Sequence, residues 1–139
     1  MERWFVDAAY VVALANERDV LHTRARDLAT RIKREKVELV TTQAILLEVA
    51  SALSPVRSRK SAVLFVEELR DGAVVLPLTP DLLWEAWDMY KTHTDKEWTW
   101  VDTISFVAMR REGLTEALTS DHHFEQASFR ALLAPDEQP

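Results

Sequence analysis

The chain has 139 residues, 47% hydrophobic content and a formal net charge of -6, which predicts one folded domain and excludes a disordered chain. It has no cysteine, which excludes disulfides, thiol catalysis and cysteine-based metal sites, and its acidic balance argues against binding nucleic acid by overall charge. Glu2 and Arg3 lead into an apolar stretch that Asp7 interrupts, and no run approaches the roughly 18 to 20 apolar residues that span a bilayer. We therefore expect no signal peptide, no membrane association and a cytoplasmic location.

The first half of the chain alternates short apolar runs with helical patterns. Residues 8–15 are apolar all round, which is typical of a buried helix, whereas 20–35 has an amphipathic helical spacing. Thr42 is a good N-cap residue. The expected elements are a strand over 3–6, helices over 8–15 and 20–35, a strand over 38–41, and a helix that follows Thr42 and ends before Pro55.

The second half continues the alternation and ends in a short tail. We expect a helix over 57–70 ended by Asp71-Gly72, a strand over 73–78, a helix from Pro80 to about Thr92, a helix over 99–111 closed by Gly113, a strand over 118–120, a helical turn over 122–126 and a strand over 129–133. Residues 1–133 would form the domain and 134–139 a frayed tail. Strands that alternate with helices predict an α/β fold with a mostly parallel sheet covered on both faces.

Four carboxylates that lie far apart in the sequence are the candidate site: Asp7, Glu48, Asp102 and Asp121. Three of them mark a place where a strand or loop gives way to a helix. In an open α/β sheet such places converge outside the carboxyl ends of the strands, where these folds bind ligands. Four acids that meet there would repel one another unless a cation lay between them. Oxygen ligands without cysteine suit a hard cation, so the pattern predicts a Mg²⁺ site that Mn²⁺ could also occupy.

Each acid also has a purely structural explanation. Asp7 and Asp121 could be helix N-caps, and the segment from Thr99 to Asp102 matches a capping box. Glu48 is harder to explain in this way, because its helical neighbours form a small, mostly apolar surface on which an unpaired glutamate is costly. The structural alternative for Glu48 is an ion pair with an arginine.

Four segments together resemble the PIN domain, and within it the VapC-type ribonuclease toxins of toxin–antitoxin pairs. They are FVDAAYVVALANERDVLH, TTQAILLEVASAL, DKEWTWVDTISFVAMRREG and ALTSDHHFEQASF, so the resemblance covers essentially the whole chain. In this resemblance Asp7, Glu48, Asp102 and Asp121 fall on the acidic metal site, and Thr99 on a Ser or Thr that often lies beside it. Trp100 and Val101 replace residues that are smaller or polar in the family. Ser128 replaces a glycine, a change that we expect to be neutral.

The resemblance implies a three-layer α/β/α sandwich around a sheet of about five strands. It also implies a Mg²⁺-dependent endoribonuclease that acts on RNA, forms a homodimer and is neutralised by a small antitoxin protein. Asp7, Asp102 and Asp121 are then candidate metal ligands, while Glu48 is either a ligand or orients the attacking water. Thr99 either hydrogen-bonds an acid or phosphate, or only caps its helix.

Other residues and other functions fit the sequence less well. Packing and turn formation account for His122-His123, and Trp84 and Trp87 are expected in the core or on a dimer surface rather than as platforms for bases. Six basic residues could extend a phosphate track: Arg24, Arg31, Arg57, Arg59, Lys60 and Arg110. The alternatives are an inactive PIN-like module that binds RNA or protein, a haloacid dehalogenase-type phosphatase, which would need a second aspartate at Ala9, and a receiver domain, which would need an acid at Val6.

Overall fold

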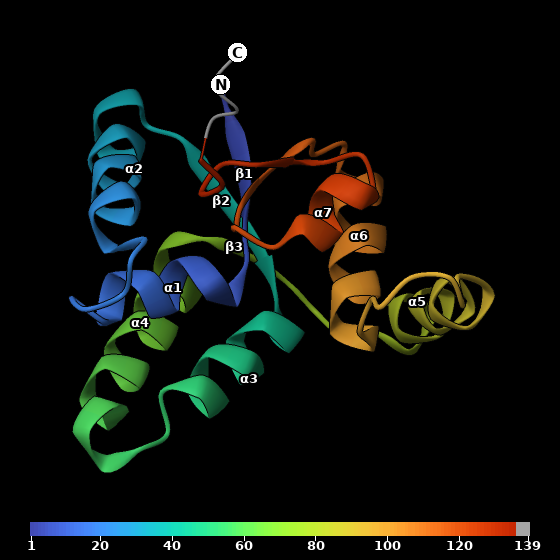
Figure 1. Cartoon of the computed structure of the whole chain (residues 1–139), viewed down its shortest axis with the longest axis horizontal. Coiled ribbons are helices and arrows are strands. Elements are labelled where there is room, and N and C mark those ends of the chain that lie inside the picture. Colours follow the sequence, from blue (N-terminus) through green and yellow to red (C-terminus); the bar gives the residue numbers. More distant parts are fainter. Residues whose placement is uncertain (136–139) are drawn as a thin grey trace.

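A parallel β-sheet forms the centre of the molecule (Figure 1). The computed structural model describes residues 1–135. Five strands pair in the order β3-β2-β1-β4-β5, and every pair is parallel. Their bounds are β1 (Arg3–Val6), β2 (Glu38–Thr42), β3 (Val74–Leu76), β4 (Glu116–Leu118) and β5 (Arg130–Ala131).

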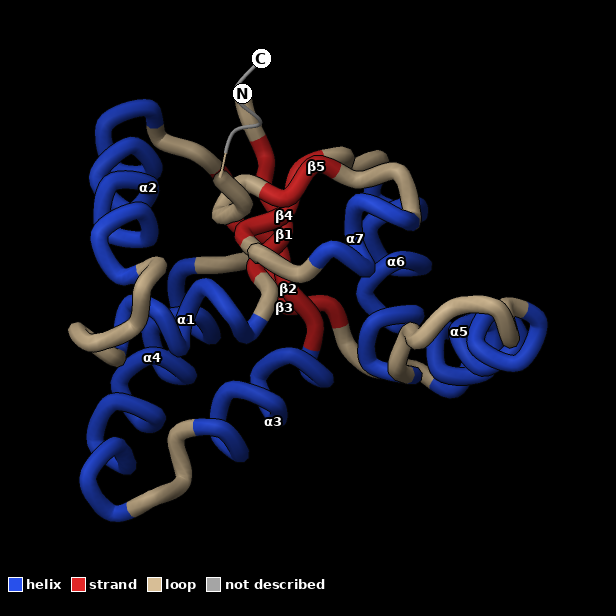
Figure 2. The backbone as a smooth tube through the Cα atoms, in the orientation of Figure 1, coloured by secondary structure: helices blue, strands red, loops and turns tan. Residues whose placement is uncertain are grey.

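Helices cover both faces of this sheet (Figure 2). On one side lie α1 (Ala8–Ala15), α2 (His22–Glu35), α3 (Gln43–Ala52) and α4 (Arg59–Gly72), with a short 3-10 helix (Val56–Ser58) before α4. On the other lie α5 (Pro80–Thr92), α6 (Trp100–Glu112) and α7 (His122–Gln126). The predicted three-layer α/β/α arrangement is confirmed. No helix within residues 1–135 has the length and apolar character that a membrane crossing requires.

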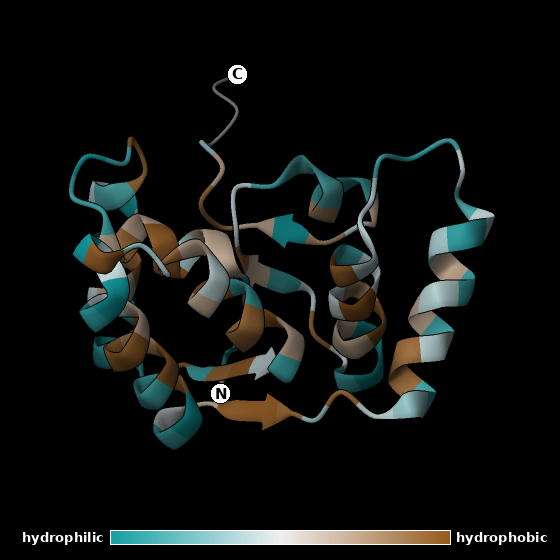
Figure 3. Ribbon diagram, turned by 90° about the horizontal axis from the view of Figure 1, so that it is seen from below, coloured by the Kyte–Doolittle hydropathy of each residue, from teal (hydrophilic) through white to brown (hydrophobic). Residues whose placement is uncertain are grey.

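The core lies between the sheet and the two helical layers. β1 is its centre, since Trp4, Phe5 and Val6 have no exposed surface. On the α6 side, Phe106 and Phe124 meet edge to face with ring centroids 5.0 Å apart. Figure 3 shows hydrophobic colour on the lowest strand and on helix turns beside the sheet, and hydrophilic colour on parts of the other strands and of the connecting loops.

Local hydrogen bonds explain where the observed boundaries differ from the predicted ones. The helix predicted over 20–35 begins at His22, because Asp19 Oδ1 accepts the Leu21 amide and holds a turn before it. The strand predicted over 118–120 is wrong: β4 ends at Leu118, and the following residues turn toward α7. The strands predicted over 73–78 and 129–133 are shorter than expected, and the helix predicted over 57–70 is preceded by the 3-10 turn.

The serine at position 128, where the family usually has glycine, is not neutral for the backbone. Ser128 has φ 73°, in the left-handed region that favours glycine. The predicted tail at 134–139 lies outside the described residues from position 136 onward.

Candidate active site

The candidate site lies at the point in the sheet where the direction in which successive strands are added reverses. The chain builds outward from β1 through β2 to β3, and then returns to place β4 on the other side of β1. In open α/β sheets, this point of change at the carboxyl ends of two strands, here β1 and β4, is where a ligand-binding crevice usually lies. Asp7 directly follows β1, and Asp121 follows β4 after a two-residue connection.

Asp7 is buried at this edge and does not act as a cap. It occupies the N-cap position of α1, but its carboxylate makes no side-chain capping hydrogen bond. Instead its Oδ2 accepts the Thr119 hydroxyl at 2.7 Å. Burial raises the pKa of Asp7 from 3.8 to about 6, against the lowering effect of the Thr119 hydroxyl and the Ala8 amide. The negative charges of Asp102 and Asp121 raise this pKa further, so three predicted acids act on one another.

Glu48 joins the same group from α3. Partial desolvation raises its pKa from 4.5 to about 7, and repulsion by Asp7, Asp102 and Asp121 adds to the shift. Glu48 is itself exposed, while Ala44, Ile45 and Val49 form the buried side of α3, and the desolvation that remains is still enough to make its charge costly. Within residues 1–135 no arginine or lysine pairs with Glu48. The alternative of a structural ion pair therefore has no support in this part of the chain.

Asp102 and Asp121 are helix caps and members of the cluster at the same time. Asp102 Oδ2 accepts the Thr99 amide at 3.0 Å, and Thr99 Oγ1 accepts the Asp102 amide at 3.0 Å, which completes the predicted capping box. Asp121 Oδ1 accepts the His123 amide and so caps α7. A cap uses one N–H donor and leaves other oxygen lone pairs available. Capping therefore does not exclude a role as a ligand.

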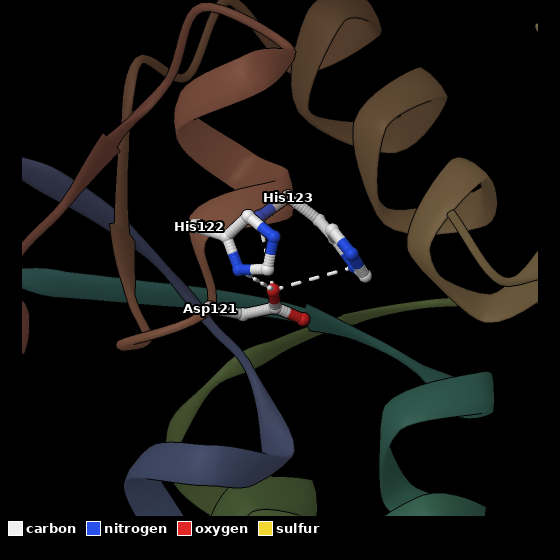
Figure 4. Close-up of side chains that lie close together, drawn as sticks. All are labelled: Asp121, His122 and His123. Carbon is white, nitrogen blue, oxygen red and sulfur yellow. Dashed lines mark hydrogen bonds and ion pairs between the residues drawn. The ribbon is translucent and has the colours of Figure 1, made fainter. Parts of the chain in front are cut away.

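His123 connects these two acids. Its Nδ1 lies 2.9 Å from Asp102 Oδ2 and 3.3 Å from Asp121 Oδ1. Figure 4 shows the rings of His122 and His123 next to each other, and both face the same oxygen of Asp121, Oδ1. Ligand atoms of Asp121, His122 and His123 lie within 4.8 Å of one another, whereas among residues 1–135 no three of the four predicted acids are that closely grouped.

The chemistry of these side chains fits a hard divalent cation. Asp7, Glu48, Asp102 and Asp121 supply only oxygen atoms, their charges repel one another, and within residues 1–135 no lysine or arginine forms an ion pair with any of them. Mg²⁺ commonly retains several waters, which allows carboxylates that do not touch to share one ion. Asp7, Asp102 and Asp121 would hold it directly or through water.

Comparison with known proteins identifies the family. The model for "PIN domain" matches residues 4–130. The chain belongs to the PIN domain family. It is 31% identical over 127 residues to the 23S rRNA-specific endonuclease VapC20 of Mycobacterium tuberculosis, and this match spans 90% of the chain and 94% of the relative.

Solved structures agree with this assignment. The crystal structure of Mycobacterium tuberculosis VapC20, a sarcin-ricin loop cleaving toxin, matches with a TM-score of 0.78 and 29% identity, over 90% of this chain and 95% of that one. VapBC2 from Rickettsia felis, bound to promoter DNA, has a TM-score of 0.65 at 8% identity and covers 93% and 96% of the two chains. FitAcB from Neisseria gonorrhoeae has a TM-score of 0.61 at 16% identity, with 91% and 94% covered. The last two show the fold alone, and the predicted relation to VapC-type PIN domains is confirmed.

Sequence reasoning missed two residues of this PIN domain site. His123 was assigned to packing, although a histidine two residues after a capping aspartate is placed to reach neighbouring acids. Thr119 was assigned to a strand, yet it is fully buried and its hydroxyl both donates to Asp7 and accepts the Asp121 amide at 3.1 Å. A threonine between a buried strand and an acid was the available signal. Of the basic residues suggested for a phosphate track, Arg31 pairs with Glu2 and Glu35 and lies over Trp4.

Replacing Thr119 by valine tests its role in positioning the two acids. We expect the free energy of unfolding to fall by about 1.5–3 kcal/mol near pH 7.5, because a hydrogen bond to a charged group is lost and the Asp121 amide loses its acceptor. The matched control is Thr41→Val, since Thr41 is equally buried but donates to the neutral Val6 carbonyl at 2.8 Å. Its expected cost is about 0.5–1.5 kcal/mol. Urea unfolding measures both, and equal losses would contradict a special role for Thr119.

Proposed function

We propose that this chain is a Mg²⁺-dependent endoribonuclease of the VapC type that hydrolyses RNA phosphodiester bonds. The observation that carries the proposal is the convergence of Asp7, Glu48, Asp102 and Asp121 at the crevice between β1 and β4, without a lysine or arginine partner within residues 1–135. A buried carboxylate is normally paired with a cationic group, and the strongly raised pKa values of Asp7 and Glu48 are typical of functional sites. Ribosomal RNA is the first substrate to test, because the 31% identical relative is a 23S rRNA-specific endonuclease.

The side chains divide the work according to their surroundings. Asp7, Asp102 and Asp121 would hold the cation, with Mn²⁺ as a substitute. When bound, this ion lowers the pKa of a water and stabilises negative charge on the phosphate and the leaving oxygen. Glu48 is solvent-accessible and its pKa is raised to about 7, so its carboxylate is suited to orient the attacking water. Thr99 Oγ1 already accepts an amide and retains its hydroxyl hydrogen for a phosphate oxygen.

We further propose that a small antitoxin protein neutralises the enzyme in the cytoplasm and that the enzyme is a homodimer. Family membership supports the partner, and so does the surface of α3 and α4. Leu47, Val63 and Leu64 are 66%, 50% and 54% exposed on these helices. Large exposed apolar side chains that cluster on neighbouring elements are typical of protein–protein contact sites.

The direct test of activity incubates purified protein with ribosomal RNA or a structured fragment of it. Cleavage is expected with Mg²⁺ or Mn²⁺ and is expected to stop with EDTA. The inactive-module alternative predicts RNA binding without cleavage under every metal condition. Cleavage that persists undiminished in EDTA would contradict the role assigned to the four acids.

The toxin role is tested separately in cells. Expression of the chain alone is expected to stop growth of a bacterial host, and coexpression of its small partner protein is expected to restore growth. The partner would shield a negatively charged crevice, for which an arginine side chain is chemically suited. Normal growth in cells whose lysates contain active nuclease would refute the toxin role and leave the enzyme assignment intact.

A further inference from the structure

A large aromatic cavity lies beside the acid cluster. It is formed by the end of α5, the connection from His93 to Thr99, and the start of α6, and it has a volume of about 780 Å³. The groove between α1, α2 and α4 has less than half that volume, about 360 Å³. The aromatic walls of the larger cavity come from Trp87, Tyr90, Trp98 and Trp100. Trp98 also belongs to the core, whereas Tyr90 is 40% exposed.

The rings form two groups with fixed orientations. Trp87 stacks with Tyr90 at 5.1 Å between centroids and lies 4.8 Å from Trp100. Trp98 packs against His93 at 5.0 Å. Hydrogen bonds hold two of the rings, because Trp98 Nε1 donates to Gln126 Oε1 and Trp100 Nε1 donates to the Leu83 carbonyl. Flat, preoriented rings beside an open cavity are suited to stacking with another planar group.

The charges at this cavity differ from those of the whole chain. Its lining has two lysines, Lys91 and Lys96, and one acid, Glu97, although the net charge of the protein is -6. Lys91 and Lys96 pair with Asp88 and Asp95 at 3.4 and 3.5 Å. Exposed pairs of this kind contribute little, so both ammonium groups can exchange their partner for a phosphate.

The cavity adjoins the acid cluster at Thr99. Thr99 lines the cavity, and its Oγ1 accepts the amide of Asp102. On the other side, the bond from Trp98 to Gln126 fixes the cavity wall to α7, the helix that carries His123. A nucleotide whose base entered the cavity would therefore have its backbone beside Asp102.

We propose that this cavity binds one unpaired nucleotide of the RNA next to the cleaved bond, with the base stacked on Trp87 and the phosphate near Lys96. This inference rests on the proposed RNA nuclease function. It also revises the expectation that Trp87 belongs to the core or to a dimer surface. Stacking on aromatic rings binds unpaired bases with little sequence preference, so selection of the RNA would rest on its shape and on contacts elsewhere.

The test measures RNA binding separately from cleavage. Full-length Asp7→Asn protein, which keeps the RNA intact, is titrated into a fluorescein-labelled single-stranded RNA of about ten nucleotides, a length that exceeds one small binding site. Trp87→Ala is expected to weaken binding about 10- to 100-fold, the loss typical of one base–aromatic stack. The control is Trp84→Phe, on the same helix, because Trp84 is 55% exposed and does not line the cavity, and phenylalanine keeps a ring against Trp100, whose centroid lies 5.8 Å from that of Trp84. Tyr90→Leu keeps apolar bulk with a smaller change in packing and is expected to weaken binding in the same direction.

A second arm removes the base instead of the ring. RNAs with an abasic sugar at successive positions are expected to bind about 10- to 100-fold more weakly at one position, and Trp87→Ala is expected to remove that dependence. Equal RNA affinity of the Trp87 and Trp84 variants would overturn the proposal. If both variants instead dissociate a dimer, as measured by light scattering, and leave RNA affinity unchanged, the cavity belongs to a second copy of the chain and the proposal fails. In either case cleavage by the wild type would keep the nuclease assignment, whereas absence of both binding and cleavage would refute the two together.

Discussion

Asp7→Asn protein is expected to cleave RNA about 100- to 1,000-fold more slowly than the wild type, as is typical when one stabilising group at a reacting centre is removed. Asparagine keeps the shape of the side chain, and its Oδ1 can still accept the Thr119 hydroxyl that Asp7 accepts at 2.7 Å. The change therefore removes a negative charge and little else. Initial rates with Mg²⁺ in excess, together with circular dichroism of the folded variant, measure the effect.

The matched control for this variant is Asp19→Asn. Asp19 also supports a local turn, because its Oδ1 accepts the Leu21 amide at 2.8 Å, but it is not among the charges that act on Asp7. Its substitution is expected to leave the rate within about twofold, as for most surface changes. Full activity of the Asp7 variant, or an equal loss in both variants, would show that the carboxylate does not take part in the reaction.

Local sequence patterns were sufficient to predict most elements of the fold. Thr42, Thr79 and Thr99 each cap the helix that follows, and in all three a hydroxyl accepts a backbone amide of the first turn. These signals need only neighbouring residues, which is why they can be recognised in a single sequence. The end of β4 could not be found in this way, because Thr119 leaves the strand to bond Asp7, a residue 112 positions away.

The candidate site shows the same division between local and distant information. The positions of the acids at strand–helix junctions follow from the sequence, since topology brings such junctions to one edge. The sequence leaves open whether Asp102 and Asp121 are caps or ligands. The geometry permits both uses. The contact of His123 with Asp102 depends on how α6 and α7 pack, and only the structure could provide it.

Metal-free protein is expected to lose stability as the pH rises from about 4 to 7, and Asp7→Asn is expected to remove the part of this loss that comes from Asp7. Burial raises the pKa of Asp7 from 3.8 to about 6 in the folded state. A carboxyl with a raised pKa binds more protons when folded, so its stabilising effect is complete below the ordinary pKa and disappears as the pH passes through about 6. A shift of this size corresponds to a loss of about 3 kcal/mol. Glu48, whose pKa is raised to about 7, contributes in the same direction over a slightly higher range.

Urea unfolding in EDTA between pH 4 and 8 measures this effect as a difference between wild type and variant. Asp7→Asn is expected to be the more stable protein above pH 6, and the difference is expected to shrink toward pH 4, where Asp7 is protonated in the folded state and only partly ionised in the unfolded state. Mg²⁺ at tenfold excess over its dissociation constant contributes about 1.4 kcal/mol to the wild type. It is expected to stabilise the variant less, because one ligand has been lost, so the gap between the two proteins narrows. Two outcomes would contradict this expectation: a stability difference that does not depend on pH, or a variant that is less stable than the wild type at pH 7.5 in EDTA. Either would mean that the negative charge of Asp7 does not destabilise the metal-free protein. The case for a cation among these four acids would then lose its main support.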